Sequence, residues 1–149
     1  MLLSGCNFKL GKYTVNNFNI TEDKPFIFYY TNELAKNITL EPKYKCNIID
    51  TNFYSKKVLS PEDCETVHNF IKSLRKSNYI TKPSDLPSKP DYKMYFTFSK
   101  EKYVIDVYNE KYLSVYPWDG NYTADYLDMT GVYNSYNLYG LCKYLIPKE

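Results

Sequence analysis

The first residues to weigh for chemistry are a thiol and an imidazole one helical turn apart. Cys64 and His68, the one histidine of the sequence, stand four residues apart in a predicted helix, so their side chains can meet. A nucleophilic hydrolase needs a base that an acid orients and that faces the nucleophile. No Gly-x-Ser-x-Gly segment accompanies the pair, and Cys64 falls on the apolar stripe of the helix, where access is poor. The sequence therefore predicts no catalytic residue here.

Three carboxylates lie in the segment Trp118–Asp128, namely Asp119, Asp125 and Asp128. Two carboxyl groups held ~5–9.5 Å apart can hydrolyse a glycosidic bond, so an enzyme acting on cell-envelope glycans is one hypothesis for the chain. The odd offset between Asp125 and Asp128 places them on opposite faces of a strand, which weakens that hypothesis. Calcium binding through Asp119, Asn121 and Asp125 is not favoured, because the segment lacks the Asp-x-Asp-x-Asp-Gly pattern.

Other patterns of cofactor, metal or nucleic-acid binding are missing from the sequence. It contains no C-x-x-C pair and no glycine-rich phosphate loop. Without a C-x-x-C pair and with His68 as its one imidazole, the sequence does not match the ligand spacing of structural zinc sites. The 19 basic and 17 acidic residues give a net charge of +2, which offers no electrostatic footprint for nucleic acid. We therefore expect no cofactor, no metal and a non-enzymatic function.

The N-terminal tetrapeptide Leu-Ser-Gly-Cys, which ends at Cys6, resembles a bacterial lipobox. Cleavage before Cys6 and its acylation would anchor the protein to the outer face of the cell membrane. A chance match is the alternative, because the five preceding residues lack the charged and apolar regions of an export signal. On this interpretation residues 1–6 are a signal remnant, and residues 7–45 are a tether or extension that packs on a single domain at residues 46–149.

The remaining cysteines are Cys46, Cys64 and Cys142. Outside the cytoplasm one disulfide could form among them. Cys64 with Cys142 is the favoured pair, since both fall on apolar faces of predicted helices. The alternative is that all three are small buried hydrophobic residues.

Hydrophobic periodicity predicts an α+β fold. Ser60-Pro61-Glu62-Asp63 is typical of a helix start, and apolar residues follow at helical spacing. From Tyr92 the period changes to two, through four short strands that end near Met129. A strand is expected within residues 45–59 and a second helix at Asn134–Ile146. A short helix with Pro25 in its first turn is favoured, and a strand at Phe26–Tyr30 is the alternative. The order predicts an antiparallel sheet of four to five strands with two helices packed on one face.

The most unusual feature of the composition is its 18 tyrosines. The alternation places several of them on the sheet face opposite the helices, with two aromatic residues at the rim. Tyrosine is stiff and amphipathic, which suits it to contact with a peptide, a protein or a cell-wall glycan. The alternative is structural: tyrosine has high strand propensity, and residues 7–45 could cover this face. The candidate ligand-binding residues are Tyr95, Asp106, Tyr108, Tyr112, Tyr116, Trp118 and Tyr122.

Several blocks together resemble a family of lipoproteins of unknown function from low-GC Gram-positive bacteria. They are the lipobox-like start, the helix from Ser60, and the segments Tyr116-Pro117-Trp118-Asp119-Gly120-Asn121-Tyr122 and Asn137-Leu138-Tyr139-Gly140-Leu141-Cys142-Lys143-Tyr144-Leu145-Ile146-Pro147. The resemblance implies lipidation at Cys6 and attachment to the membrane through that anchor. It implies no activity, so the function rests on the tyrosine-rich face.

Overall fold

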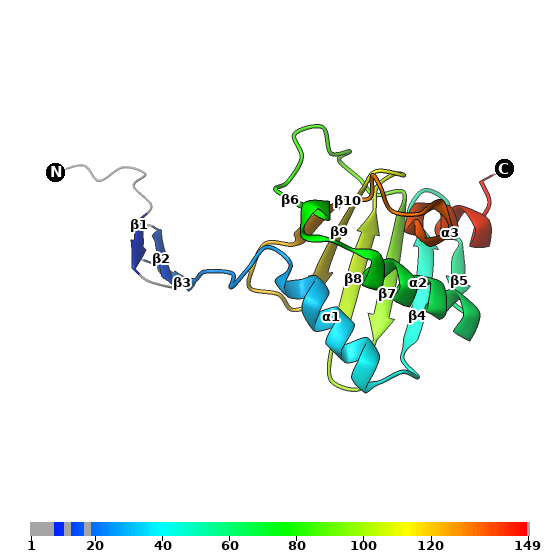
Figure 1. Cartoon of the computed structure of the whole chain (residues 1–149), viewed down its shortest axis with the longest axis horizontal. Helices are drawn as coiled ribbons and strands as arrows, with labels where there is room; N and C mark the ends of the chain where they lie inside the picture. The colour runs from blue at the N-terminus through cyan, green and yellow to red at the C-terminus, as the bar shows by residue number, and fades with distance from the viewer. Residues whose placement is uncertain (1–7, 11–12, 17–18, 149) are drawn as a thin grey trace.

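The computed structural model describes residues 8–10, 13–16 and 19–148 (Figure 1). Near the N-terminus, β1 (Phe8–Leu10), β2 (Tyr13–Asn16) and β3 (Asn19–Glu22) form a small antiparallel sheet. The rest of the described chain forms three α-helices and seven strands. The helices are α1 (Tyr29–Leu40), α2 (Pro61–Ser73) and α3 (Leu138–Leu145). The strands are β4 (Lys45–Asp50), β5 (Lys56–Val58), β6 (Tyr79–Ile80), β7 (Tyr92–Thr97), β8 (Lys102–Val107), β9 (Tyr112–Pro117) and β10 (Asp125–Asp128).

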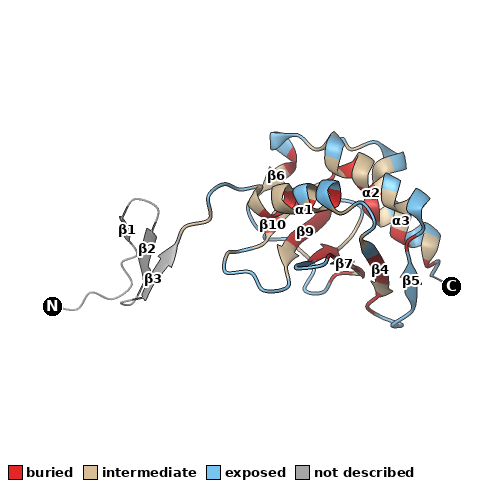
Figure 2. Cartoon of the chain, turned by 90° about the horizontal axis from the view of Figure 1, so that it is seen from below, coloured by how far each residue is buried: buried red, intermediate tan, exposed pale blue. Residues whose placement is uncertain are grey.

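The seven strands make one antiparallel sheet in the order β5-β4-β7-β8-β9-β10-β6. All three helices pack against the same face of this sheet (Figures 1 and 2). The α+β class and the single-sided helix layer are confirmed, but the prediction of four to five strands and two helices was wrong. The missed edge strands β5 and β6 have only three and two residues, too few to show an alternation in the sequence.

The core lies between the sheet and the helices. Alternate residues of the central strands are completely buried on this side, among them Met94, Phe96, Ile105 and Leu113. The helices supply Leu34, Val67, Phe70 and Leu138, each at most 1% exposed. Figure 2 shows the same separation, with red buried positions where helices and strands face each other. On the opposite sheet face, here called the open face, no helix packs among the residues that the structure describes.

Helix α2 begins where the sequence predicts. Ser60 is its N-cap and Pro61 its first residue. The Asp63 N–H donates to Ser60 Oγ over 3.1 Å, while the Ser60 N–H donates to Asp63 Oδ2 over 2.9 Å. This reciprocal capping box satisfies two otherwise unpaired amides and fixes the start of the helix.

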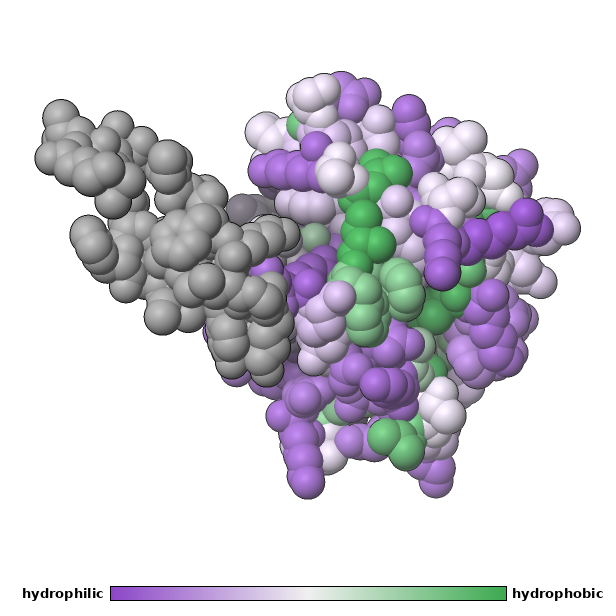
Figure 3. Space-filling model, turned by 60° about the vertical axis from the view of Figure 1, so that its left-hand side comes forward, coloured by the Kyte–Doolittle hydropathy of each residue, from purple (hydrophilic) through white to green (hydrophobic). Residues whose placement is uncertain are grey.

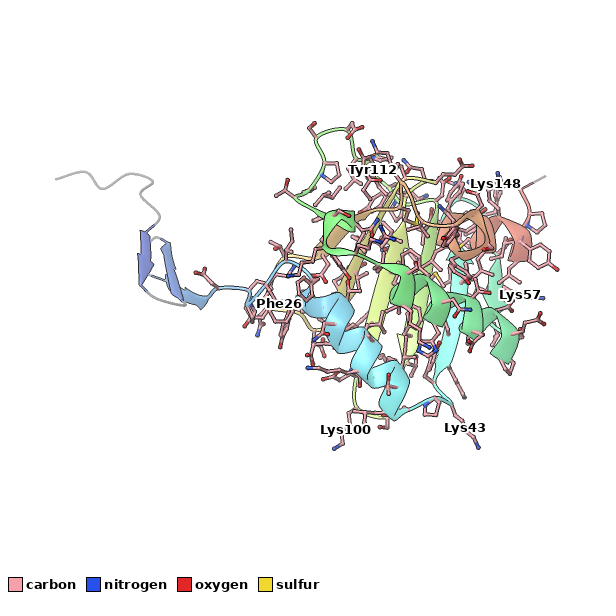
Figure 4. The ribbon with its side chains drawn as sticks, viewed as in Figure 1. Phe26, Lys43, Lys57, Lys100, Tyr112 and Lys148 are labelled. Atoms are coloured by element: carbon pink, nitrogen blue, oxygen red, sulfur yellow. The ribbon has the colours of Figure 1, made fainter. Side chains whose placement is uncertain are left out.

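Helix α1 lies inside the extension predicted at residues 7–45, and it is longer than the short helix expected there. Its Tyr30, Leu34 and Ile38 side chains are buried in the core, so the folded body begins before residue 46. The run Phe26–Tyr30 has the composition of a strand, which hides the helix in the sequence. Figure 3 shows a narrow apolar band on one side of the molecule. Phe26, labelled in Figure 4 near the start of α1, packs on Phe28 with ring centroids 4.5 Å apart.

A buried carboxylate from the sheet holds the N-terminal turn of α1. Asp125 on β10 is fully buried and accepts hydrogen bonds from the Thr31 N–H over 2.7 Å and the Thr31 hydroxyl over 2.8 Å. Lys24 lies 2.5 Å from the other carboxylate oxygen. The anion satisfies a free amide of the helix start and complements the positive end of the helix dipole. Tertiary contact thus stabilises the helix where sequence propensity does not.

Candidate binding site on the open sheet face

Strand register assembles the open face from residues far apart in the sequence. Across the sheet, Tyr126 pairs with Ser114, Ser114 with Asp106, and Asp106 with Lys93. The neighbouring row runs from Tyr116 through Val104 to Tyr95. Because side chains of paired residues point to the same face, these seven residues share one surface. Small residues alternate with large ones in it, and the large side chains leave Val104 and Ser114 only 1% exposed.

The centre of this face holds a charged cluster of Lys93, Asp106 and Tyr116. Lys93 Nζ lies 3.2 Å from Asp106 Oδ1 and donates to the Tyr116 hydroxyl over 3.4 Å. The Tyr116 hydroxyl lies 3.2 Å from each Asp106 oxygen and donates to that carboxylate. The Asp106 side chain is 10% exposed, against 32% for Lys93. A charged pair is therefore held at the surface of the sheet, where apolar residues would pack at lower cost.

The ionisation of the charged cluster reflects this burial. Burial raises the pKa of Asp106, although Lys93 and Tyr116 both counteract it. Burial is the largest effect on Lys93 and opposes its positive charge, but Asp106 and Tyr116 together outweigh burial, so the Lys93 pKa is raised. Burial first, then the charge on Asp106, raises the Tyr116 pKa to about 12. A desolvated carboxylate with a fixed cation and a fixed hydroxyl is a preorganised polar site.

Half-buried tyrosines surround the charged cluster. Tyr95 lies 6.3 Å from the Trp118 ring, centroid to centroid, and Trp118 is 64% exposed. Tyr108 is half-buried, and burial raises its pKa. Beside Tyr95 and Trp118 the surface is hollowed by about 370 Å³, and Lys56 lines the same hollow. The structure thus brings Tyr95, Asp106, Tyr108 and Tyr116 together as the sequence predicts, with Trp118 at the rim.

Two of the predicted residues are not available on this face. Tyr112 is only 7% exposed, because its hydroxyl donates to Asp85 over 3.1 Å and the loop that follows β6 covers it. Tyr122 turns towards α1, where its ring lies edge-on to Tyr29 at 5.7 Å and its N–H donates to the Tyr30 hydroxyl over 2.7 Å. The sequence pattern shows neither the path of the β6–β7 loop nor the approach of α1, so it does not predict that Tyr112 is covered or that Tyr122 faces α1.

Sequence reasoning missed two members of the open face, Lys93 and Tyr126. Lys93 is the residue that pairs with Asp106, and the short turn between β7 and β8 already fixes that register. Tyr126 is hidden because β10 has four residues, too few to show which face it presents. The strand register implied by this turn would have placed Lys93 beside Asp106.

The carboxylates of Trp118–Asp128 do not converge. Asp125 is committed to α1 and Lys24, as described above. Asp128 accepts from the Thr130 N–H over 2.8 Å in a turn, and Asp119 lies exposed in the loop after β9. No pair among them is placed to act on one glycosidic bond, so the geometry gives no support to the glycan-active enzyme hypothesis at this segment.

The cysteines of the described chain, Cys46, Cys64 and Cys142, are free thiols, so the predicted Cys64–Cys142 disulfide does not form. Cys142 is completely buried, whereas Cys64 is partly buried beside the Tyr44 hydroxyl. Burial also raises the pKa of the β4 residue Cys46. The sequence predicts which face of its helix each of Cys64 and Cys142 occupies, but it does not predict how far apart the helices hold the two thiols. Cys6, the predicted lipidation site, lies outside the described residues.

Residues 8–10, 13–16 and 19–148 contain neither a candidate metal site nor a candidate membrane span. No cluster of three or more histidine, cysteine or acidic side chains there could hold a metal ion. No helix in that part of the chain has the length and apolar character needed to span a membrane.

Comparison with known proteins identifies the family. Residues 24–142 match the model of a domain of unknown function, DUF4883. A crystal structure of a putative lipoprotein from Clostridium perfringens is 35% identical and superposes with a TM-score of 0.75, covering 84% of this chain and 99% of that one. A search of curated proteins finds no match. The matched region runs from Lys24, which anchors α1, to Cys142 in α3, and so the chain belongs to the DUF4883 family of domains.

Proposed function

We propose that this protein is a lipid-anchored, extracytoplasmic interaction module without enzymatic activity, which binds a partner protein through the open face. The observation that carries the proposal is the charged cluster of Lys93, Asp106 and Tyr116 at the centre of a sheet face that no helix covers. Apolar residues would stabilise the sheet as well as or better than this largely buried ion pair, so stability alone gives little reason for it, whereas recognition of a partner gives one.

The chemistry of the face favours a protein as the partner. A hollow of about 370 Å³ lies towards one end of the face, beside Tyr95 and Trp118, and the charged cluster does not line it. Tyrosine rings with two or three rotatable torsions bury much area at low entropic cost, and tyrosine is enriched at the energetic centres of protein interfaces. Lys93 and Asp106 would supply charge complementarity and fix the orientation of the partner.

The proposed location rests on two observations. The relative from Clostridium perfringens is named a putative lipoprotein, and this chain carries Leu-Ser-Gly-Cys ending at Cys6. Two or more acyl chains on Cys6 would give stable anchoring, since each buried CH₂ contributes about 0.8 kcal/mol. The open face would then meet partners outside the cell. Mass spectrometry of the native N-terminus tests the acylation directly.

The proposal predicts that replacing Tyr95 and Tyr116 together by alanine abolishes partner binding without unfolding the domain. Both rings are partly exposed, so their removal leaves the core intact. Loss of two tyrosine rings from the centre of the interface should weaken binding of the partner by roughly 100-fold or more. The measurement is affinity capture of envelope proteins by the acylated protein, followed by titration of the captured partner.

The matched control is the pair Tyr133→Ala and Tyr144→Ala, which removes two rings that are 73% and 78% exposed and lie outside the open face. Binding should persist in this control. Equal binding by the Tyr95/Tyr116 variant and the control would contradict the assignment of the open face.

A further inference from the structure

The end of the sheet opposite Tyr112 carries a second cleft, which shares Trp118 with the rim of the open face. It lies between the first turns of α1, the β7–β8 hairpin and the loop after β9, and its volume is about 660 Å³. Figure 4 labels Lys100 at the hairpin, at the other end of the strands from Tyr112. A volume of this size is in the range of small-ligand sites. Neither Lys93 nor Asp106 lines it.

Aromatic rings form one side of the cleft. Tyr29 and Tyr122 stand edge-to-face with their centroids 5.7 Å apart and their planes at 89°. Trp118 lies at the mouth with 64% of its surface exposed. Its backbone N–H donates to the Lys102 carbonyl over 2.9 Å, which fixes the position of the residue while the indole stays available. A fixed, exposed indole beside fixed phenol rings is a stacking platform.

The loop that carries Trp118 is held close to α1 at Gly120. A Cβ atom on Gly120 would lie 2.9 Å from Pro117 Cγ and 2.9 Å from the Tyr30 hydroxyl. A side chain at this position would therefore push the loop away from α1. Glycine permits the close approach that shapes this wall of the cleft.

The polar groups of the cleft include both acceptors and donors. Glu101 is fixed by hydrogen bonds from Asn37 Nδ2 over 3.0 Å and from the Tyr103 hydroxyl over 3.1 Å. Burial raises the Tyr103 pKa, and the charges on Glu101 and Glu33 raise it further, so both carboxylates lie near this hydroxyl. The same cleft is lined by Lys100 and Lys102, which are donors.

This combination selects among ligand classes. Two lysines in the wall disfavour an organic cation, although the aromatic rings alone would suit one. Three carboxylates, from Glu33, Glu101 and Asp119, disfavour a phosphate. A neutral ring with many hydroxyl groups fits both features, since its CH face packs on an aromatic ring and its hydroxyls donate to carboxylates and accept from lysines. We propose that this cleft binds a short, uncharged glycan.

The lone tryptophan makes the proposal directly measurable, because all indole fluorescence comes from Trp118. The full chain is titrated with defined oligosaccharides, namely β-1,4-linked N-acetylglucosamine trimer and tetramer, cellotetraose and maltotetraose. A saturable shift of the Trp118 emission with at least one of them is the expected result. Tetramethylammonium and inorganic phosphate are titrated in parallel, to test a cationic and an anionic ligand against the oligosaccharides.

Three single substitutions test whether the oligosaccharide binds in this cleft. Calorimetric affinity for the oligosaccharide should fall at least tenfold in Trp118→Ala, whose exposed ring can be removed without disturbing the core, and in Glu33→Gln. Lys93→Met should leave it unchanged, which separates this cleft from the charged cluster on the open face. No saturable shift with any of the oligosaccharides at up to ~10 mM would overturn the proposal, as would tighter binding of tetramethylammonium or phosphate, or undiminished affinity in Trp118→Ala.

Discussion

Replacing Asp125 by alanine is expected to destabilise the domain by about 3–5 kcal/mol, the usual cost of removing one partner from a buried ion pair. The Asp125 side chain is completely buried, and its loss strands the Lys24 ammonium, which is only 16% exposed. It also leaves the Thr31 N–H and hydroxyl without their buried acceptor. Since domains of this kind are stable by roughly 5–15 kcal/mol, a large share of the total stability depends on this carboxylate.

Urea denaturation measures this prediction, with the free energy of unfolding compared between variant and parent. Asp119→Ala is the control, because Asp119 is exposed in the loop after β9 and its removal should change stability by no more than ~0.5 kcal/mol. If Asp125→Ala lost less than about 1 kcal/mol, the carboxylate would not be the anchor of α1 described above.

The charged cluster should show the opposite behaviour, with binding lost and stability retained. In the double variant Lys93→Met, Asp106→Leu, an ion pair is replaced by apolar side chains of similar volume, a change that is neutral or stabilising in buried sites. Because Lys93 is about one third exposed, we expect a gain of no more than about 1 kcal/mol at pH 7. Affinity for the partner protein should fall by a factor of roughly 30–1,000, as when a desolvated interfacial charge pair is disrupted.

The pH dependence of stability gives a second reading of the same variant. The folded-state pKa of Asp106 is raised above its ordinary value of 3.8, so its protonated form favours folding. That stabilisation is complete below the ordinary pKa and is lost as pH rises through the raised one. The parent should therefore gain stability relative to the double variant as pH falls from neutrality towards 4. A pH-independent difference in unfolding free energy would contradict the assigned burial of Asp106.

Local signals in the sequence predicted the central part of the fold well. Ser60 and Asp63 cap α2 as their spacing indicates, and the period-two pattern from Tyr92 gives β7, β8 and β9. Helix α1 could not be predicted with the same precision, because its stabilising partner Asp125 lies 94 residues from Thr31. The two-residue strand β6 carries no periodicity, and its existence depends on pairing with β10.

The candidate site, like the fold, could be predicted from the sequence only in part. Alternation along single strands was enough to place Tyr95, Asp106 and Tyr116 on one face. The fate of Tyr112 and Tyr122 depended on Asp85 and Tyr30, which approach from other parts of the chain. Side-chain direction is a local property of a strand, whereas exposure is set by what packs over it, and only the folded structure supplies that.

Site-specific photo-crosslinking tests the open face most directly. A benzophenone side chain is placed at position 95, and in a second protein at position 144, where Tyr144 is 78% exposed on α3. Both acylated proteins are irradiated on intact cells. The open-face account predicts one discrete protein adduct from position 95 that unlabelled parent domain competes away, and no such adduct from position 144. The same adducts from both positions, or none from position 95, would contradict it.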